Sequence, residues 1–132
     1  MSTLDLLLKI DQSKMVRPTK KVEIPRLSKE AGDKVIFTLQ ALTHDEQEEI
    51  SDISAGDGEI DQGALRAHTI IKGLVDPSLK STELLKHFGA ATPKDLLLKT
   101  NFLLTGEVAI LYNEISELSG FSADAVTELK NE

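Results

Sequence analysis

Hydrophobic positions alternate in one part of the chain and follow helical spacing in most of the rest. Strict alternation of branched or aromatic residues with their neighbours is typical of a half-buried strand, and it occurs at Val35, Phe37 and Leu39. An earlier apolar segment contains Pro25, which favours an edge strand because proline cannot donate to a ladder. A turn is expected between them at Ser28–Lys34. We therefore predict a β-hairpin over residues 21–42.

From Thr43 onward the apolar spacing becomes helical. Thr43 and Glu46 match the Thr-x-x-Glu capping box, in which each side chain accepts from the backbone amide of the other residue. Glycine and proline then divide the remaining sequence into successive helical segments. These segments are expected at about 43–53, 60–76, 81–88, 92–98, 105–119 and 122–129.

The first twenty residues have a pattern of their own. Leu4, Leu7 and Leu8 stand at helical spacing after Ser2, which predicts a short capped helix followed by a polar linker. The predicted fold is α+β: an N-terminal arm and β-hairpin followed by a mainly α-helical body. We expect a single domain over residues 1–132, made of the arm with its short helix (1–20), the hairpin (21–42) and the helical body (43–132).

Composition narrows the class of protein. A chain of 132 residues with 40% hydrophobic and 28% charged residues can form a globular core. It has no cysteine, which excludes disulfides, cysteine-based zinc sites and thiol catalysis. We see neither a signal peptide nor an apolar run near the roughly 20 residues that cross a bilayer. A cytoplasmic protein without a membrane partner is expected.

The charge pattern bears on partners. A net charge of −7 argues against nucleic acid, whose binding depends on neutralising phosphates. The segment Lys9–Lys34 contains eight Lys or Arg residues and four acids. The segment Asp45–Asp61 contains eight acids and no Lys or Arg. The two charged segments either neutralise each other within one fold or favour head-to-tail contact between copies of the chain. A homo-oligomer is therefore one of the two expectations.

Catalytic and metal-binding motifs are missing from the sequence. His44 stands among acids but has no second histidine at ligand spacing, and His68 falls beside an apolar helix face as a boundary or core residue. The acidic loop Asp52–Asp61 does not follow the ligand order of a calcium-binding loop. Phosphate-binding and nucleophile motifs do not occur either. We therefore predict a protein that binds another protein, with no enzymatic activity, no cofactor and no metal.

The arm supplies the candidate binding residues. Its leucine-rich segment has more hydrophobic side chains than a two-turn helix usually covers. Two interpretations remain: the arm docks on the body of its own chain, or it is a helix that enters the groove of a partner. The candidate partner-binding residues are Leu4, Leu7, Leu8 and Ile10.

The order of features resembles a known family. The segments that carry the likeness are the Leu-Asp-Leu-Leu-Leu run from Leu4, Pro18–Ser28, Phe37–Thr43, the acidic Asp45–Ile50, Leu103–Val108, Leu111–Ile115 and Leu118–Phe121. In their order and spacing they resemble the XkdN-like phage tail assembly chaperones of prophages and related elements. The likeness spans nearly the whole chain, and the family has no catalytic motif to transfer.

The resemblance implies a role in tail morphogenesis. Such chaperones bind the tape measure protein, keep its hydrophobic helices soluble, help to recruit tail tube subunits, and are not expected in the mature virion. Two other classes stay open from the sequence: a structural component of the tail tube or baseplate, and a small protein-binding adaptor unrelated to phage.

Overall fold

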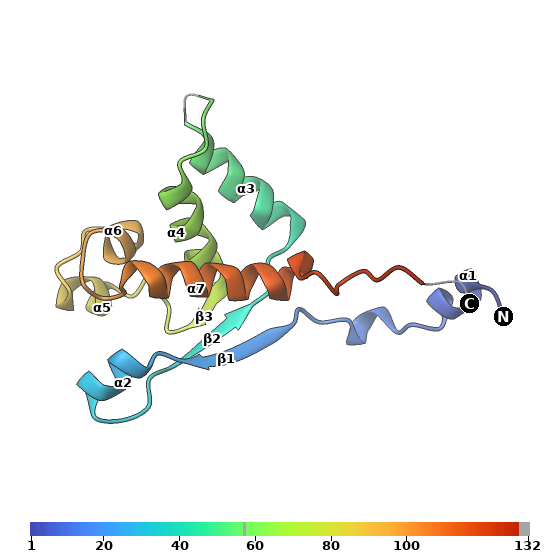
Figure 1. Ribbon diagram of the computed structural model, residues 1–132, viewed down its shortest axis with the longest axis horizontal. Helices are drawn as coiled ribbons and strands as arrows, with labels where there is room; N and C mark the ends of the chain where they lie inside the picture. The colour runs from blue at the N-terminus through green and yellow to red at the C-terminus, as the bar shows by residue number, and fades with distance from the viewer. Residues whose placement is uncertain (57, 130–132) are drawn as a thin grey trace.

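The computed structural model describes residues 1–56 and 58–129 of the chain. Figure 1 shows a helical body over a small sheet, with the N-terminal helix at the far end of a long extension. The helices are α1 (Thr3–Leu8), α2 (Pro25–Ala31), α3 (His44–Ala55), α4 (Gln62–Gly73), α5 (Thr82–His87), α6 (Pro93–Leu98) and α7 (Thr105–Ser116), with a 3-10 turn at Gln12–Lys14 and a π-helical turn at Glu117–Phe121. The strands are β1 (Thr19–Glu23), β2 (Ile36–Gln40) and β3 (Leu74–Asp76). The predicted α+β class is confirmed.

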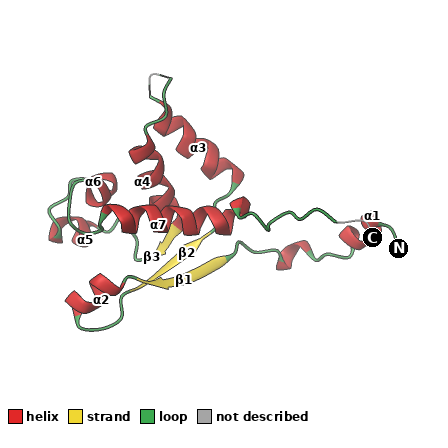
Figure 2. Ribbon diagram, in the orientation of Figure 1, coloured by secondary structure: helices red, strands yellow, loops and turns green. Residues whose placement is uncertain are grey.

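The sheet is antiparallel, with strand order β1-β2-β3 (Figure 2). Val22 lies opposite Phe37 in the β1–β2 pair, and an irregularity at Thr38 and Leu39 shifts the register toward β3. Phe37 and Leu39 are buried as their alternation predicted, whereas Ile36 faces outward. The central strand therefore has one face in the core.

The predicted hairpin is only partly right. Its two strands pair, but β1 begins at Thr19, and the connection is helix α2 where a turn was predicted at Ser28–Lys34. Pro25 occupies the first turn of α2, where its missing N–H costs nothing, and Gly32 ends the helix with φ 82°, a conformation that suits glycine. Ser28 then accepts the amide of Val35 at 2.9 Å, which directs the chain into β2.

Two other predictions are corrected. Leu74–Asp76 forms the third strand, where the sequence pattern predicted that the helix continues to near Asp76-Pro77. Asp76 precedes Pro77, and a residue before proline disfavours helical geometry and favours an extended one. The helix expected at residues 122–129 is also absent from the described chain, in which Val126 and Leu129 are 90% and 92% exposed. These two side chains therefore have no covering surface in the described chain that would stabilise a helix.

The remaining helices agree with the prediction in position. The Thr43–Glu46 capping box forms at the start of α3, and Thr92 caps α6. The break predicted after α3 includes Asp57, which lies outside the described residues. Helix α7 packs against both α4 and β2, so that it connects the helices with the sheet. The core is one cluster, whose largest fully buried residues include Phe37, Leu39, Ile50, Ile70, Leu79, Leu96, Leu111 and Ile115.

Helices α4 and α7 approach each other closely in this core. A Cβ placed on Gly73, the last residue of α4, would lie 2.7 Å from both Cδ1 and Cγ2 of Ile115. Ile115 is fully buried and branched at Cβ, so it has little room to move away. Glycine at position 73 therefore sets the distance between the two helices.

An ion pair connects α2 with the start of α7. Arg26 Nη2 lies 2.8 Å from Glu107 Oε1, and Nε lies 3.0 Å from Oε2, so the pair is bidentate. Arg26 also donates to the carbonyl of Phe102 at 2.8 Å. Glu107 accepts the amide of Leu104, the N-cap of α7, at 2.7 Å. The hydrogen bond from Arg26, opposed by burial, lowers the pKa of Glu107 below its usual value.

Gly73→Ala tests the α4–α7 contact. Overpacking costs about 1–3 kcal/mol, and the better helix propensity of alanine returns up to about 1 kcal/mol. We expect a net loss of roughly 1–2 kcal/mol in the free energy of unfolding, measured by urea denaturation. Gly106→Ala in α7 is the matched control, because a Cβ there would meet no atom within 4 Å. Equal stability of the two variants would contradict the contact.

Glu107→Gln tests the ion pair through pH. The folded-state pKa of Glu107 is lowered, so its contribution to stability is full above the unfolded value of about 4.3 and is lost as pH falls through the folded pKa. We expect the wild type to be more stable than the variant near neutral pH and this difference to shrink below about pH 4. Urea unfolding over that range measures it.

Glu48→Gln serves as its control, since it removes an exposed carboxylate of α3. A difference between wild type and Glu107→Gln that stays constant with pH would show that the carboxylate charge contributes nothing.

Candidate functional site

The helix at the tip of the arm is closed at its N-terminus by its own side chains. The Ser2 amide donates to Asp5 Oδ2 at 3.0 Å, and the Asp5 amide donates to Ser2 Oγ at 3.1 Å, which together form a capping box. The hydrogen bond from the Ser2 backbone is the largest cause that lowers the pKa of Asp5. The predicted helix around Leu4, Leu7 and Leu8 is confirmed as α1, and local hydrogen bonding defines where it begins.

The candidate binding residues are all exposed. The exposed fractions are 63% for Leu4, 58% for Leu7, 74% for Leu8 and 49% for Ile10, and α1 contains no buried residue. Figure 1 shows α1 far from the helical body, beyond the 3-10 turn at Gln12–Lys14. Of the two interpretations of the arm, docking on its own body is therefore not the arrangement in this structure.

The root of the arm is held on the body by polar contacts. Arg17 Nη1 lies 2.8 Å from Glu46 Oε1 and 3.3 Å from the carbonyl of Ala41. The amide of Ala41 donates to the carbonyl of Pro18 at 3.0 Å. Lys20 of β1 forms an ion pair with Glu114 of α7, which raises the pKa of the lysine. The arm, residues 1–20, is thus fixed where it joins the sheet and free of the body at its tip.

These contacts bring the two charged segments together. Arg17 belongs to the basic segment and Glu46 to the acidic one, and Lys72 of α4 pairs with Glu49 at 3.1 Å. Part of the charge separation seen in the sequence is therefore cancelled within the fold. Glu48 and Asp52 of α3 form no ion pair among the described residues, so this helix keeps an acidic surface.

A second candidate surface lies between α2 and α5, at the opposite end of the molecule from α1 (Figure 1). We name it the α2–α5 groove; its volume is about 530 Å³, and its lining is Arg26, Leu27, Glu30, Ala31, Val35, Phe37, Pro77, Leu84, His87, Phe88, Asn101 and Phe102. Three aromatic rings form its floor: the Phe102 ring centroid lies 6.3 Å from that of Phe37 and 4.9 Å from that of Phe88.

The sequence pattern does not indicate this groove. Phe88 falls at the end of a predicted short helix and Phe102 between two predicted helices, and no periodicity relates either of them to Leu27 or Val35. The groove forms only because the unpredicted helix α2 lies across from α5. The signal that could have indicated it is the position of two phenylalanines at breaks between predicted helices, Phe88 before Gly89 and Phe102 after Lys99-Thr100-Asn101.

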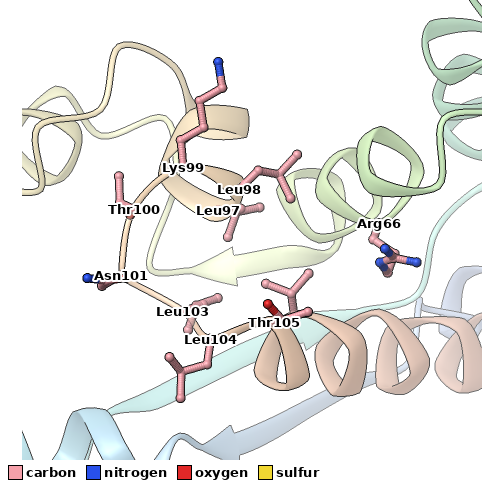
Figure 3. Close-up of a pocket in the computed structure, with 10 residues that line it drawn as sticks. Arg66, Leu97, Leu98, Lys99, Thr100, Asn101, Leu103, Leu104 and Thr105 are labelled. Atoms are coloured by element: carbon pink, nitrogen blue, oxygen red, sulfur yellow. The ribbon is translucent and has the colours of Figure 1, made fainter.

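A smaller hollow of about 380 Å³ lies between α4 and the α6–α7 connection. Figure 3 shows Arg66 on α4 across from the segment Leu97–Thr105, with Lys99 pointing outward. Its lining mixes leucines with two cations and the hydroxyls of Thr100 and Thr105. Among the described residues, its lining includes no carboxylate, histidine or cysteine.

The histidines lie in three different helices. His44 begins α3, and His87 of α5 contacts Phe88 edge to face at 4.9 Å. His68 of α4 is half-buried, as predicted for a boundary residue, and burial together with Lys94 and Lys72 lowers its pKa. Within residues 1–56 and 58–129, no three His, Cys, Asp or Glu residues are grouped as metal ligands. The acidic loop considered for calcium includes Asp57, which is outside the described residues.

No helix in the described part of the chain combines the length and the apolar character needed to span a membrane.

The fold is similar to a known crystal structure, that of the protein yqbn, a structural genomics target. The TM-score is 0.65 with 23% sequence identity, and the match covers 85% of this chain and 93% of that one. At this identity the likeness concerns the fold alone. A comparison with curated proteins finds no significant match.

Family membership follows from the sequence itself. Residues 4–131 match the family described as phage XkdN-like tail assembly chaperone protein (TAC). The match includes all of the helices and strands described above except the first residue of α1. The chain therefore belongs to the XkdN-like phage tail assembly chaperone family.

Proposed function

We propose that this tail assembly chaperone binds the tape measure protein, keeps its hydrophobic helices soluble, and helps to recruit tail tube subunits. The observation that carries the proposal is the exposed leucine stripe of α1, held away from the body in a member of this family. Leu4, Leu7 and Leu8, with Ile10 beyond the helix, are the proposed contact residues.

The stripe has the form of a helix that binds in a groove. Residues at i, i+3 and i+4 share one face of a helix, so Leu4, Leu7 and Leu8 present a continuous apolar strip. Fully burying a leucine side chain is worth about 1.5–3 kcal/mol, so burial of the strip against a client helix gives several kcal/mol before the cost of association. This is enough to shield one hydrophobic segment of a client.

The acidic body supports the same role. A net charge of −7 keeps a complex with a hydrophobic client from aggregating. The anchored root of the arm, with Arg17 on Glu46, lets α1 hold a client while the body stays in solvent. We propose that this happens in the cytoplasm of the bacterial host during tail morphogenesis, and that the protein is absent from the mature virion.

Replacing the stripe tests the proposal. The triple variant Leu4→Ser, Leu7→Ser, Leu8→Ser leaves the body unchanged, because α1 has no buried residue. On co-expression with the tape measure protein of the same phage or prophage, we expect the wild type to keep the client soluble and to co-elute with it. The variant should bind the client at least about 100-fold more weakly, because several kcal/mol of burial are lost.

The matched control changes three other exposed apolar residues of the arm: Leu6→Ser, Met15→Ser and Val16→Ser. Leu6 lies on the opposite face of α1, and the other two follow the helix. This variant should retain the client. Equal retention by both triple variants would remove the stripe from the proposal. A client that stays insoluble with the wild type would favour a structural tail component or an adaptor.

A further inference from the structure

We propose that chains of this protein join head to tail, with α1 of one copy seated in the α2–α5 groove of the next copy. The leucine stripe and the groove are complementary apolar surfaces that lie at opposite ends of one chain. Figure 1 shows α1 at one end of the longest axis and α2 and α5 at the other. The inference uses the arm of the proposed function, but it needs no client, and a client helix would compete for the same stripe.

The groove offers the apolar surface that the stripe lacks. Its walls are Leu27 and Val35 on one side and Leu84 on the other, and its aromatic floor includes the exposed ring of Phe88. A volume of about 530 Å³ lies within the usual range of protein binding pockets, roughly 300–1,000 Å³. A two-turn helix that inserts Leu4, Leu7 and Leu8 would cover most of this surface.

Charge complementarity selects the orientation. On α1, Asp5 and the C-cap residue Lys9 lie four positions apart, on one flank of the leucine stripe. On α2, Arg26 and Glu30 are also four positions apart, and both line the groove. On α1 the acid precedes the cation along the chain, whereas on α2 the cation precedes the acid. If α1 lies parallel to α2, Asp5 faces Arg26 and Lys9 faces Glu30.

The ion pairs within the chain do not prevent these charged residues of α1 and α2 from pairing between copies. Lys9 and Glu30 form no ion pair with any residue of the described chain, so each is available. Arg26 is held by Glu107 but keeps part of its guanidinium exposed, and a second carboxylate from Asp5 would lie beside the same cation. An antiparallel orientation would place like charges together, which is unfavourable.

Such an interface is heterologous, because two different surfaces of the chain meet. Each copy then has one α1 and one groove left over, so the assembly continues until it closes into a ring or reaches its end. This arrangement differs from a symmetric dimer of arms, in which α1 would pair with α1 and the groove would stay empty.

The experiment measures the mass of the purified full chain, without client, by sedimentation velocity over a range of concentrations. Wild type should form species larger than a dimer whose mass rises with concentration. Two variants should each be monomeric alone: the triple serine variant of Leu4, Leu7 and Leu8, and Ala31→Arg, which projects a long cation into the groove from an exposed position. Mixed together, they should form one-to-one heterodimers and nothing larger.

The heterodimer is the decisive result, because only a contact between arm and groove lets one variant complement the other. A monomeric wild type at all concentrations, or a mixture that stays monomeric while both variants are folded, overturns the inference. Association that persists in the triple serine variant overturns it as well.

A charge exchange provides a second test that does not depend on Ala31→Arg. Lys9→Glu should weaken association about threefold or more, as expected for the reversal of an exposed pair. Glu30→Lys in the same chain should restore it. Failure of the restoration rules out the parallel orientation. A protein that stays monomeric yet keeps the tape measure protein soluble would overturn only the head-to-tail contact and leave the proposed function standing.

Discussion

The close contact between Gly73 and Ile115 is the constraint on which the rest of the structure depends. It lets α4 approach α7 without an intervening side chain, and α7 in turn packs on β2. The chain leaves α4 at this contact directly into β3, which completes the sheet, so the spacing of the two helices also sets where the third strand can pair. With the sheet in place, β1 fixes the root of the arm through Lys20 and Glu114.

This architecture separates a packed body from an exposed apolar helix. The core buries Phe37 and Phe102 together with many of the leucines and isoleucines of the body, whereas α1 keeps its leucines in solvent although burial would stabilise them. Neither the capping box at Ser2 nor the ion pair at Arg17 contributes a surface that would cover them. Exposed leucine side chains are unfavourable in water, and this free-energy cost is removed if another chain covers the stripe. Client helices and the groove of a neighbouring copy then compete for one element, which couples assembly of the chaperone to the supply of client.

Local signals in the sequence were enough for some elements and not for others. The capping box at Thr43 and the helix around Leu4 were predictable because a few neighbouring residues determine them. Helix α2 and strand β3 were missed, since Pro25 can begin a helix as well as mark an edge strand, and since Leu74 fits either pattern until it pairs with Leu39. The leucines of the candidate site were identified by their excess of apolar surface. The groove was not, because its residues come together only through tertiary packing.

Hydrogen exchange of α1 tests the central claim, that this helix is the surface which holds the client. The Ala31→Arg chain is the suitable form, because in the proposed head-to-tail contact its blocked groove leaves the arm of every copy unoccupied. Alone, the amides of residues 3–10 should exchange rapidly, since a solvent-exposed two-turn helix opens readily. On addition of the tape measure protein we predict strong protection of these amides. Unchanged exchange in α1, together with new protection elsewhere on the body, would contradict the account.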